Sequence, residues 1–96
     1  MSYDVKISRE ASEYLMKLDE KSKRIIYNHL ATLEKNPFPG VRGDKEKLHL
    51  DDGTIIYRVH AWRSHTAFYR IDKADKRVRI NEVLTIEQAH KKYGRL

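Results

Sequence analysis

The stretch from residue 54 to residue 72 alternates in polarity on both sides of Ser64, and this pattern constrains the fold more than any other part of the chain. Successive side chains of a strand point to opposite faces, so alternation predicts strands with one buried face. Residues 54–63 and 65–72 are therefore predicted to form two strands, which the tight connection at Ser64 joins as an antiparallel hairpin. The predicted core face holds Ile55, Tyr57, Val59, Ala61, Ala67, Tyr69 and Ile71, and the opposite face holds Ile56, Arg58, His60, Trp62, Thr66, Phe68 and Arg70.

The residues before this hairpin predict a strand followed by two helices. Residues 3–7 alternate as a half-buried strand does, and Ser8 can cap a helix that follows. Asp19 begins a second helix, and the short connection between the helices requires an antiparallel pair. The helical spacing of apolar residues is carried by Ala11, Tyr14, Leu15 and Leu18 in the first helix and by Ile25, Ile26, Leu30 and Leu33 in the second.

The remaining segments complete a chain of α+β class. Residues 41–47 read as a charged loop and residues 48–50 as a short strand or a loop. Residues 77–84 predict a last strand, with a bulge possible where the alternation is lost at 82–84. Thr85 and Gln88 form a capping-box pattern that opens a short C-terminal helix. We expect one domain, residues 1–96, with the order β-α-α-β-β-β-α, in which the helical pair packs on one face of a small antiparallel sheet.

The charge of the chain indicates an anionic partner. The net charge is +6, and all of the excess lies in residues 53–96, which carry ten Lys or Arg against four Asp or Glu. A nucleic acid or an acidic protein segment is the expected partner of that half. The absence of cysteine fits a reducing cytoplasm, and no apolar run is long enough to span a membrane.

The second half also holds side chains suited to cleaving RNA without a metal. Such a site must take a proton from a 2′-hydroxyl, stabilise negative charge at phosphorus and protonate the leaving 5′-oxygen. Histidine suits the proton transfers because its ordinary pKa lies near neutrality, and arginine suits the charge because it binds phosphate through two N–H groups. A zinc site built from His60, His65 and His90 has no supporting ligand spacing, so we expect no metal and no cofactor.

With this order of elements, the chain resembles the RelE/ParE superfamily of toxin–antitoxin toxins. The matching features are the opening YDVKIS followed by EASEYLMKLD, the helix end LEKNPFPG, the strand pair YRVHAWR and HTAFYRID, and the closing KRVRINEV with Tyr93. The resemblance covers nearly the whole chain. It implies a basic concave face on the side of the sheet away from the helical pair.

The resemblance implies two alternative activities. RelE-like members are endoribonucleases that cut mRNA in the ribosomal A site, and a cognate antitoxin holds them inactive, whereas ParE-like members inhibit DNA gyrase. The RelE-like activity is the leading expectation, and a gyrase inhibitor or a non-catalytic binding member is the alternative. We expect a free toxin that is monomeric and that forms a hetero-oligomer with its antitoxin.

The resemblance also selects candidate site residues. The candidate catalytic residues are Arg58, His60, His65, His90 and Tyr93. The candidate RNA-binding residues are Trp62, Arg63, Arg70, Arg79, Lys91 and Lys92, although Lys91 and Lys92 also suit the C-terminal end of a helix dipole. Phe68 is the candidate antitoxin-binding residue, because an apolar floor can receive a partner helix.

One position departs from the family pattern. RelE-like sequences commonly place an arginine early in the second strand of the hairpin, where this chain has His65 and Thr66. Arg63, Arg70 or Arg79 could replace that arginine, His65 could shift the site to histidine chemistry, or the nuclease could be weak or absent. The sequence leaves these alternatives open.

Overall fold

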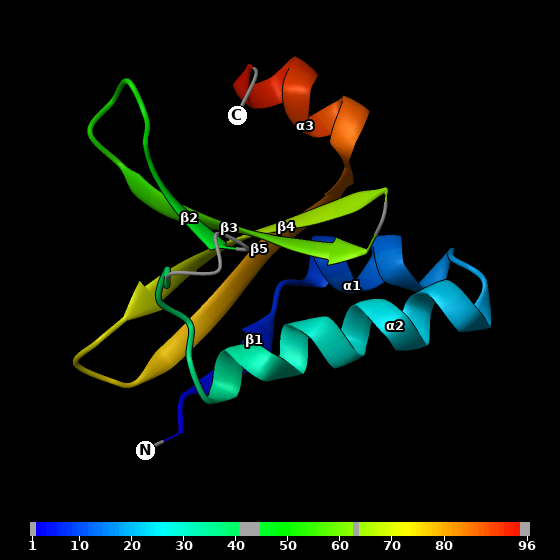
Figure 1. Ribbon diagram of the computed structural model, residues 1–96, viewed down its shortest axis with the longest axis horizontal. Helices are drawn as coiled ribbons and strands as arrows, with labels where there is room; N and C mark the ends of the chain where they lie inside the picture. The colour runs from blue at the N-terminus through cyan, green and yellow to red at the C-terminus, as the bar shows by residue number, and fades with distance from the viewer. Residues whose placement is uncertain (1, 41–44, 63, 95–96) are drawn as a thin grey trace.

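The computed structural model describes residues 2–40, 45–62 and 64–94, and it describes Trp62 by its backbone alone. The elements in chain order are β1 (Asp4–Ile7), α1 (Arg9–Met16), α2 (Glu20–Ala31) with a 3-10 turn (Thr32–Glu34), β2 (Lys45–His49), β3 (Ile55–Trp62), β4 (His65–Asp72), β5 (Arg77–Thr85) and α3 (Ile86–Tyr93) (Figure 1). The predicted α+β class is confirmed.

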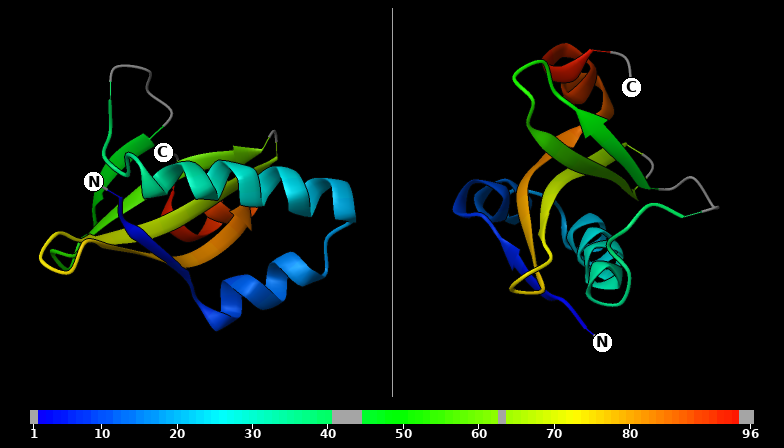
Figure 2. Two further views of the ribbon diagram at one scale, coloured as in Figure 1. Left: turned by 90° about the horizontal axis from the view of Figure 1, so that it is seen from below. Right: turned by 90° about the vertical axis from the view of Figure 1, so that its left-hand side faces the viewer.

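The five strands form one sheet in the order β1-β5-β4-β3-β2. The three neighbouring pairs from β2 to β5 are antiparallel, and β1 runs parallel to β5 at the edge. The parallel pair follows from the helical hairpin, because α1 and α2 carry the chain from one edge of the sheet across its face (Figure 2). The predicted hairpin of residues 55–72 is confirmed as the centre of this sheet.

The strand β2 corrects the predicted element order, which had four strands. Its sequence, KEKLH, has little β-propensity, and most of it was expected to be a charged loop. It is nevertheless paired residue by residue with β3, and Leu48 lies opposite Ile56 on the apolar part of the sheet face. This strand is therefore formed by pairing with β3, although the local sequence preference did not indicate a strand. The predicted loop at residues 41–44 lies outside the described residues.

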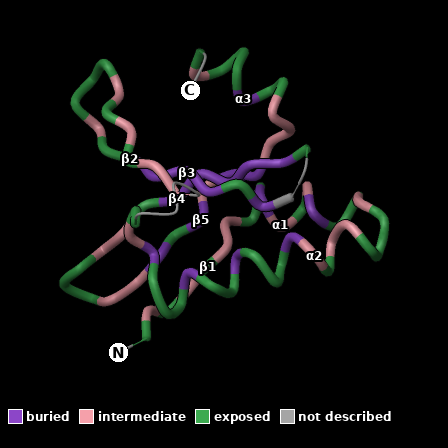
Figure 3. Tube along the Cα trace, viewed as in Figure 1, coloured by how far each residue is buried: buried purple, intermediate pink, exposed green. Residues whose placement is uncertain are grey.

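Local capping fixes the helices where the sequence predicted them. The Ser8 hydroxyl accepts a hydrogen bond from the Ala11 amide (3.1 Å), and the Asp19 carboxylate accepts one from the Ser22 amide (3.1 Å). The main core lies between these helices and one sheet face, and Figure 3 shows buried positions concentrated in the central strands. Its buried members are Ala11, Leu15, Ile26, Leu30, Leu33, Tyr57, Val59, Ala61, Ala67, Tyr69, Val78, Ile80 and Val83.

A bulge in β5 redistributes side chains between the two faces. Tyr69 pairs with Ile80 but Phe68 pairs with Glu82, so Asn81 is the extra residue, as the loss of alternation had predicted nearby. Beyond the bulge Val83 enters the main core. Glu82 is consequently placed on the opposite face, beside Phe68.

The helix α3 packs on the face opposite α1 and α2 (Figure 1). Its capping box is complete, with Thr85 and Gln88 each bonding the backbone of the other. A second, smaller apolar cluster joins it to the sheet, made of Ile56, Phe68 and Ala89 with Leu48, Leu50, Leu84 and Tyr93 around them. Within the described residues no helix is both long and apolar enough to cross a membrane.

Candidate functional site

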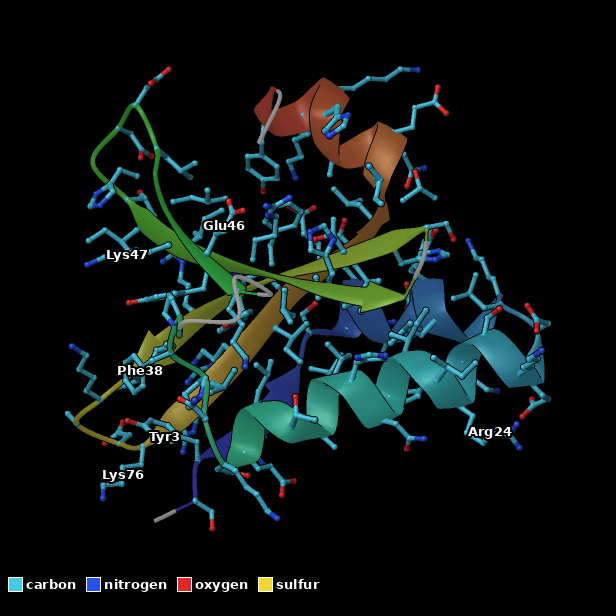
Figure 4. The ribbon with its side chains drawn as sticks, in the orientation of Figure 1. Tyr3, Arg24, Phe38, Glu46, Lys47 and Lys76 are labelled. Atoms are coloured by element: carbon cyan, nitrogen blue, oxygen red, sulfur yellow. The ribbon has the colours of Figure 1, made fainter. Side chains whose placement is uncertain are left out.

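The candidate site lies on the α3 face of the sheet and is centred on an ion pair between neighbouring strands. Arg58 of β3 stands directly opposite Glu46 of β2, and its Nη2 lies 2.5 Å from the Glu46 Oε1. The Arg58 side chain is 8% exposed, whereas the Glu46 side chain is 44% exposed. Figure 4 shows Glu46 on the side of the sheet that carries α3. A buried guanidinium is therefore held by a carboxylate that water can still reach.

Next to Arg58, an aromatic pair connects the sheet to α3. Phe68 lies opposite Arg58 in the sheet and is 1% exposed. Its ring packs against the ring of Tyr93 with centroids 4.5 Å apart. Arg58 and Tyr93 are thus brought to the same part of the face, on either side of Phe68.

A buried carboxylate holds the end of α3. Glu82 is 8% exposed and accepts hydrogen bonds from the Tyr93 hydroxyl and from the Lys92 Nζ, the latter at 2.8 and 2.9 Å. Burial, followed by the hydrogen bond to Glu82, raises the pKa of Tyr93 above its ordinary value. Tyr93 is therefore a neutral phenol near neutral pH, and its hydroxyl donates to Glu82.

A cleft opens beside this cluster. It has a volume of about 520 Å³ and lies between the β2–β3 turn and the end of α3. Its lining residues are His49, Leu50, Asp51, Asp52, Lys92 and Tyr93. The cleft gives solvent a route to Tyr93, the one predicted catalytic residue in its lining.

His60 shares the face of Arg58 but stays exposed. It lies opposite Thr66 in the hairpin, and Thr66 is 1% exposed with its hydroxyl donating to the Val59 carbonyl oxygen. Thr66, at the position of the expected arginine, is therefore part of the sheet's internal hydrogen bonding. His60 remains available to a ligand on the open side.

The structure separates His65 from the residues with which it was grouped. Its side chain turns toward α1, where Nε2 shares a hydrogen bond with the Tyr14 hydroxyl (3.1 Å) and Nδ1 shares one with Ser64 (3.1 Å). Burial lowers the pKa of His65 below its ordinary value. The expectation that His65 joins Arg58 in one site is therefore not met, because the sheet lies between them. The alternation of β4 could have shown this, since residues 65, 67, 69 and 71 share the core face.

The remaining predicted residues are scattered over the same side of the molecule. His90 and Lys91 are exposed on α3, and the Lys91 Nζ lies 3.8 Å from Glu87. Arg70 and Arg79 are exposed and stand opposite each other on β4 and β5. The side chain of Trp62 and all of Arg63 lie outside the described residues, so their predicted RNA-binding roles stay predictions.

Two acidic residues of the site were missed by sequence reasoning. Glu46 gave no signal, because its segment had no clear strand pattern. Glu82 could have been found by counting residues through the bulge, which transfers it to the face of Phe68. The α3 face of the sheet thus carries two groups of polar side chains, the Arg58–Glu46 pair and the Glu82 carboxylate bonded to Tyr93 and Lys92, with Phe68 between them.

No family model matches the chain, and no curated protein matches it in sequence. Several solved structures match its fold. The RelE–RelB complex from the archaeon Pyrococcus horikoshii matches with 25% identity and a TM-score of 0.73, over 88% of this chain and 96% of that chain. A RelBE toxin–antitoxin complex from Mycobacterium tuberculosis matches with 20% identity and a TM-score of 0.72, over 88% of this chain and 99% of that one. The free toxin RelE of Escherichia coli matches with 16% identity and a TM-score of 0.64, over 98% of this chain and 95% of that chain.

These likenesses, together with the five-stranded sheet and its two helical layers, define a toxin fold of the toxin–antitoxin class. By that fold the chain is similar to the toxins of the RelE/ParE superfamily.

Proposed function

We propose that this protein is a RelE-like toxin that cleaves mRNA on the ribosome, inhibits translation and is neutralised by a cognate antitoxin. The observation that carries the proposal is the Arg58–Glu46 pair, a guanidinium and a partly exposed carboxylate side by side on the face away from the helical hairpin. The aromatic pair Phe68–Tyr93 borders it on the other side.

This arrangement supplies the groups that metal-free RNA cleavage needs. Glu46 takes the proton of the 2′-hydroxyl, whose oxygen then bonds to phosphorus. Arg58 stabilises the added negative charge on the phosphoryl oxygens. His60, as the imidazolium, protonates the 5′-oxygen as its bond to phosphorus breaks. The products are a 2′,3′-cyclic phosphate and a free 5′-hydroxyl.

The family's arginine is absent at Thr66, so the proposal assigns the stabilisation of phosphoryl charge to Arg58. Because Thr66 is buried and bonded to Val59, its position adds no charge to the site. Arg58 is then the cation in contact with the carboxylate that accepts the proton. The RelE structures solved with RelB support an antitoxin as the partner of this protein as well.

Toeprinting of a translated message tests the proposal. Wild-type protein is expected to cut the message only when ribosomes are present. Glu46→Gln and His60→Ala are each expected to lower the cleavage rate by about 100-fold or more, the range of a lost acid or base. Arg58→Lys keeps the charge but not the two-pronged contact, and it is expected to retain partial activity.

The matched control is His29→Ala, which removes an exposed histidine of α2 on the far side of the molecule. Cleavage must be unchanged in this variant. Full activity of Glu46→Gln would contradict the assigned proton acceptor, and no cleavage by the wild type would contradict the nuclease.

A second candidate function is inhibition of DNA gyrase without nuclease activity. It is favoured by the low exposure of Arg58 and by the buried threonine at the expected arginine position. A supercoiling assay distinguishes the two: inhibition of gyrase by protein that leaves translated mRNA intact would select the ParE-like function.

A further inference from the structure

Two carboxylates stand in register on either side of the centre of the α3 face. Glu46 of β2 pairs with Arg58 of β3. Phe68 of β4 pairs with Arg58 on one side and with Glu82 of β5 on the other. Neighbouring strands are about 4.8 Å apart, so the backbone of Glu82 lies about 10 Å from that of Arg58. Glu82 therefore belongs to the surroundings of the Arg58–Glu46 pair without touching it.

Glu82 is the more buried of the two carboxylates. Its side chain is 11% exposed, whereas that of Glu46 is 44% exposed. A buried carboxylate is costly unless hydrogen-bond donors compensate it. The Tyr93 hydroxyl donates to Glu82, and the Lys92 Nζ bonds both of its oxygens at 2.8 and 2.9 Å. Because a ligand has little access to this carboxylate, Glu82 acts on the site through the residues that it holds.

The bulge at Asn81 places Glu82 on this face of the sheet. Val78 and Ile80 point into the main core, and in a regular strand residue 82 would follow them. The bulge instead turns Val83 into the core and sets Glu82 opposite Phe68. The irregularity in β5 is therefore what brings a carboxylate to the end of α3.

Glu82 holds one wall of the cleft beside the site. Tyr93 and Lys92 both line that cleft. The Tyr93 ring packs on Phe68 with centroids 4.5 Å apart, and the Lys92 Nζ lies 5.5 Å from the centre of the same ring. Because the Tyr93 hydroxyl is bonded to Glu82, the ring is the part of Tyr93 that is presented to a ligand. A ring over the strand next to Arg58 can stack on a base whose phosphate contacts Arg58.

The end of α3 depends on this anchor more than the rest of the fold does. Thr85 caps the start of the helix, and Ala89 and Tyr93 are its members in the smaller apolar cluster. The main core is built from α1, α2, the turn after α2 and the strands. Loss of Glu82 should therefore release the last turn of α3 while the sheet and the helical pair stay folded.

We propose that Glu82 is a positioning residue of the ribonuclease site, which holds the Tyr93 ring over Phe68 so that a base next to the scissile phosphate stacks on it. The inference rests on the proposed nuclease function for its substrate. Glu82 exchanges no proton with RNA and acts through Tyr93. Its removal should raise KM, because the ring is no longer held where the base binds, and should leave kcat nearly unchanged.

The test is a double-variant cycle on ribosome-dependent cleavage. Glu82→Met keeps the length of the side chain and removes its acceptors, whereas Tyr93→Leu removes the ring. Loss of one stacked base corresponds to about 5- to 150-fold in affinity, so each variant should raise KM by at least about 5-fold. In the Tyr93→Leu background, Glu82→Met should add nothing. Multiplied effects in the double variant, or an unchanged KM in Glu82→Met, would overturn the proposal.

Three comparisons separate positioning from a loss of folded protein. Poor folding reduces the number of active molecules, so a lower apparent kcat at unchanged KM would overturn the proposal. Glu82→Gln keeps an oxygen that can accept from the Tyr93 hydroxyl, and its KM should lie between those of the wild type and Glu82→Met; it also serves if Glu82→Met folds poorly. Glu87→Gln removes an α3 carboxylate from an exposed pair with Lys91 and should keep the wild-type KM.

A binding measurement distinguishes failure of this inference from failure of the nuclease. Single-stranded RNA that carries 2-aminopurine loses fluorescence when that base stacks on a ring. If the wild type cuts no mRNA but quenches this RNA, and Glu82→Met and Tyr93→Leu do not, the nuclease falls and the positioning role stands. If the wild type cuts mRNA and all three proteins quench equally, the nuclease stands and the positioning role falls. If the wild type neither cuts nor quenches, both fall.

Discussion

Glu46→Gln is the substitution that most directly tests how the site is held together. It removes the charge that faces the Arg58 guanidinium and keeps the size of the side chain. The Arg58 side chain is 8% exposed, so it has little access to water as a replacement partner. The protein should therefore lose stability, because a buried cation is left without its anion.

The size of the expected loss in stability follows from the exposed fractions of the Arg58 and Glu46 side chains. Removing one partner of a fully buried ion pair costs about 3–5 kcal/mol, whereas an exposed pair contributes at most about 1 kcal/mol. Because the Glu46 side chain is 44% exposed, this pair lies between those limits. We expect a loss of about 1–3 kcal/mol in the free energy of unfolding, or a fall of about 4–8 °C in Tm for each kcal/mol.

Urea unfolding followed by circular dichroism measures this loss as a lower midpoint at unchanged slope. Glu87→Gln is the matched control, since it removes the same charge from an exposed pair with Lys91 at 3.8 Å and should leave the midpoint where it is. A change below about 0.3 kcal/mol for Glu46→Gln would refute the reasoning, because the pair would then be no stronger than an exposed one.

The double variant Glu46→Gln with Arg58→Met separates structure from catalysis. Removing both charges should restore much of the stability that Glu46→Gln loses, since no unpaired cation remains. If cleavage is absent in this folded variant, the loss belongs to the chemistry of the pair and not to unfolding.

Three further outcomes are expected. Phe68→Ala should destabilise the protein by about 3–5 kcal/mol in urea unfolding, because it empties a buried position packed against Tyr93. The pKa of His65 is lowered in the fold, so stability should be complete above the ordinary histidine pKa of about 6.5 and should decline as the pH falls through and below it. His65→Asn should flatten that decline, and an unchanged pH profile of Tm would contradict it. Thr85→Ala removes the helix cap and should lower stability by about 1 kcal/mol, measured as a shift in the urea midpoint.

Much of the fold could be predicted because its signals are local. The alternation of residues 55–62 and 65–72 identified both central strands and their faces, and Ser8, Asp19 and Thr85 cap the three helices as their side chains indicated. Each of these signals depends on residues within a few positions of one another. The resemblance to the RelE/ParE superfamily was confirmed in the same way, since it rests on the order of such elements.

The site was predicted less completely, because its contacts join residues that are distant in sequence. Arg58 and His60 were placed correctly on one face, and Tyr93 does approach that face through Phe68. The grouping of His65 with Arg58 failed because His65 lies on the core face of β4, where its side chain bonds to Tyr14. No local sequence pattern indicated that Glu46 belongs to the site, since the strand that carries it is formed through its pairing with β3.

The sequence by itself thus determined the elements, their amphipathic faces and the excess of positive charge in residues 53–96. Tertiary structure alone decided that Arg58 is paired with Glu46 and that Glu82 holds Tyr93 and Lys92. The physical reason is the distance along the sequence over which each interaction acts. Backbone conformation responds to neighbouring residues, whereas strand register and the bulge at Asn81 are fixed by pairing between segments far apart in the chain.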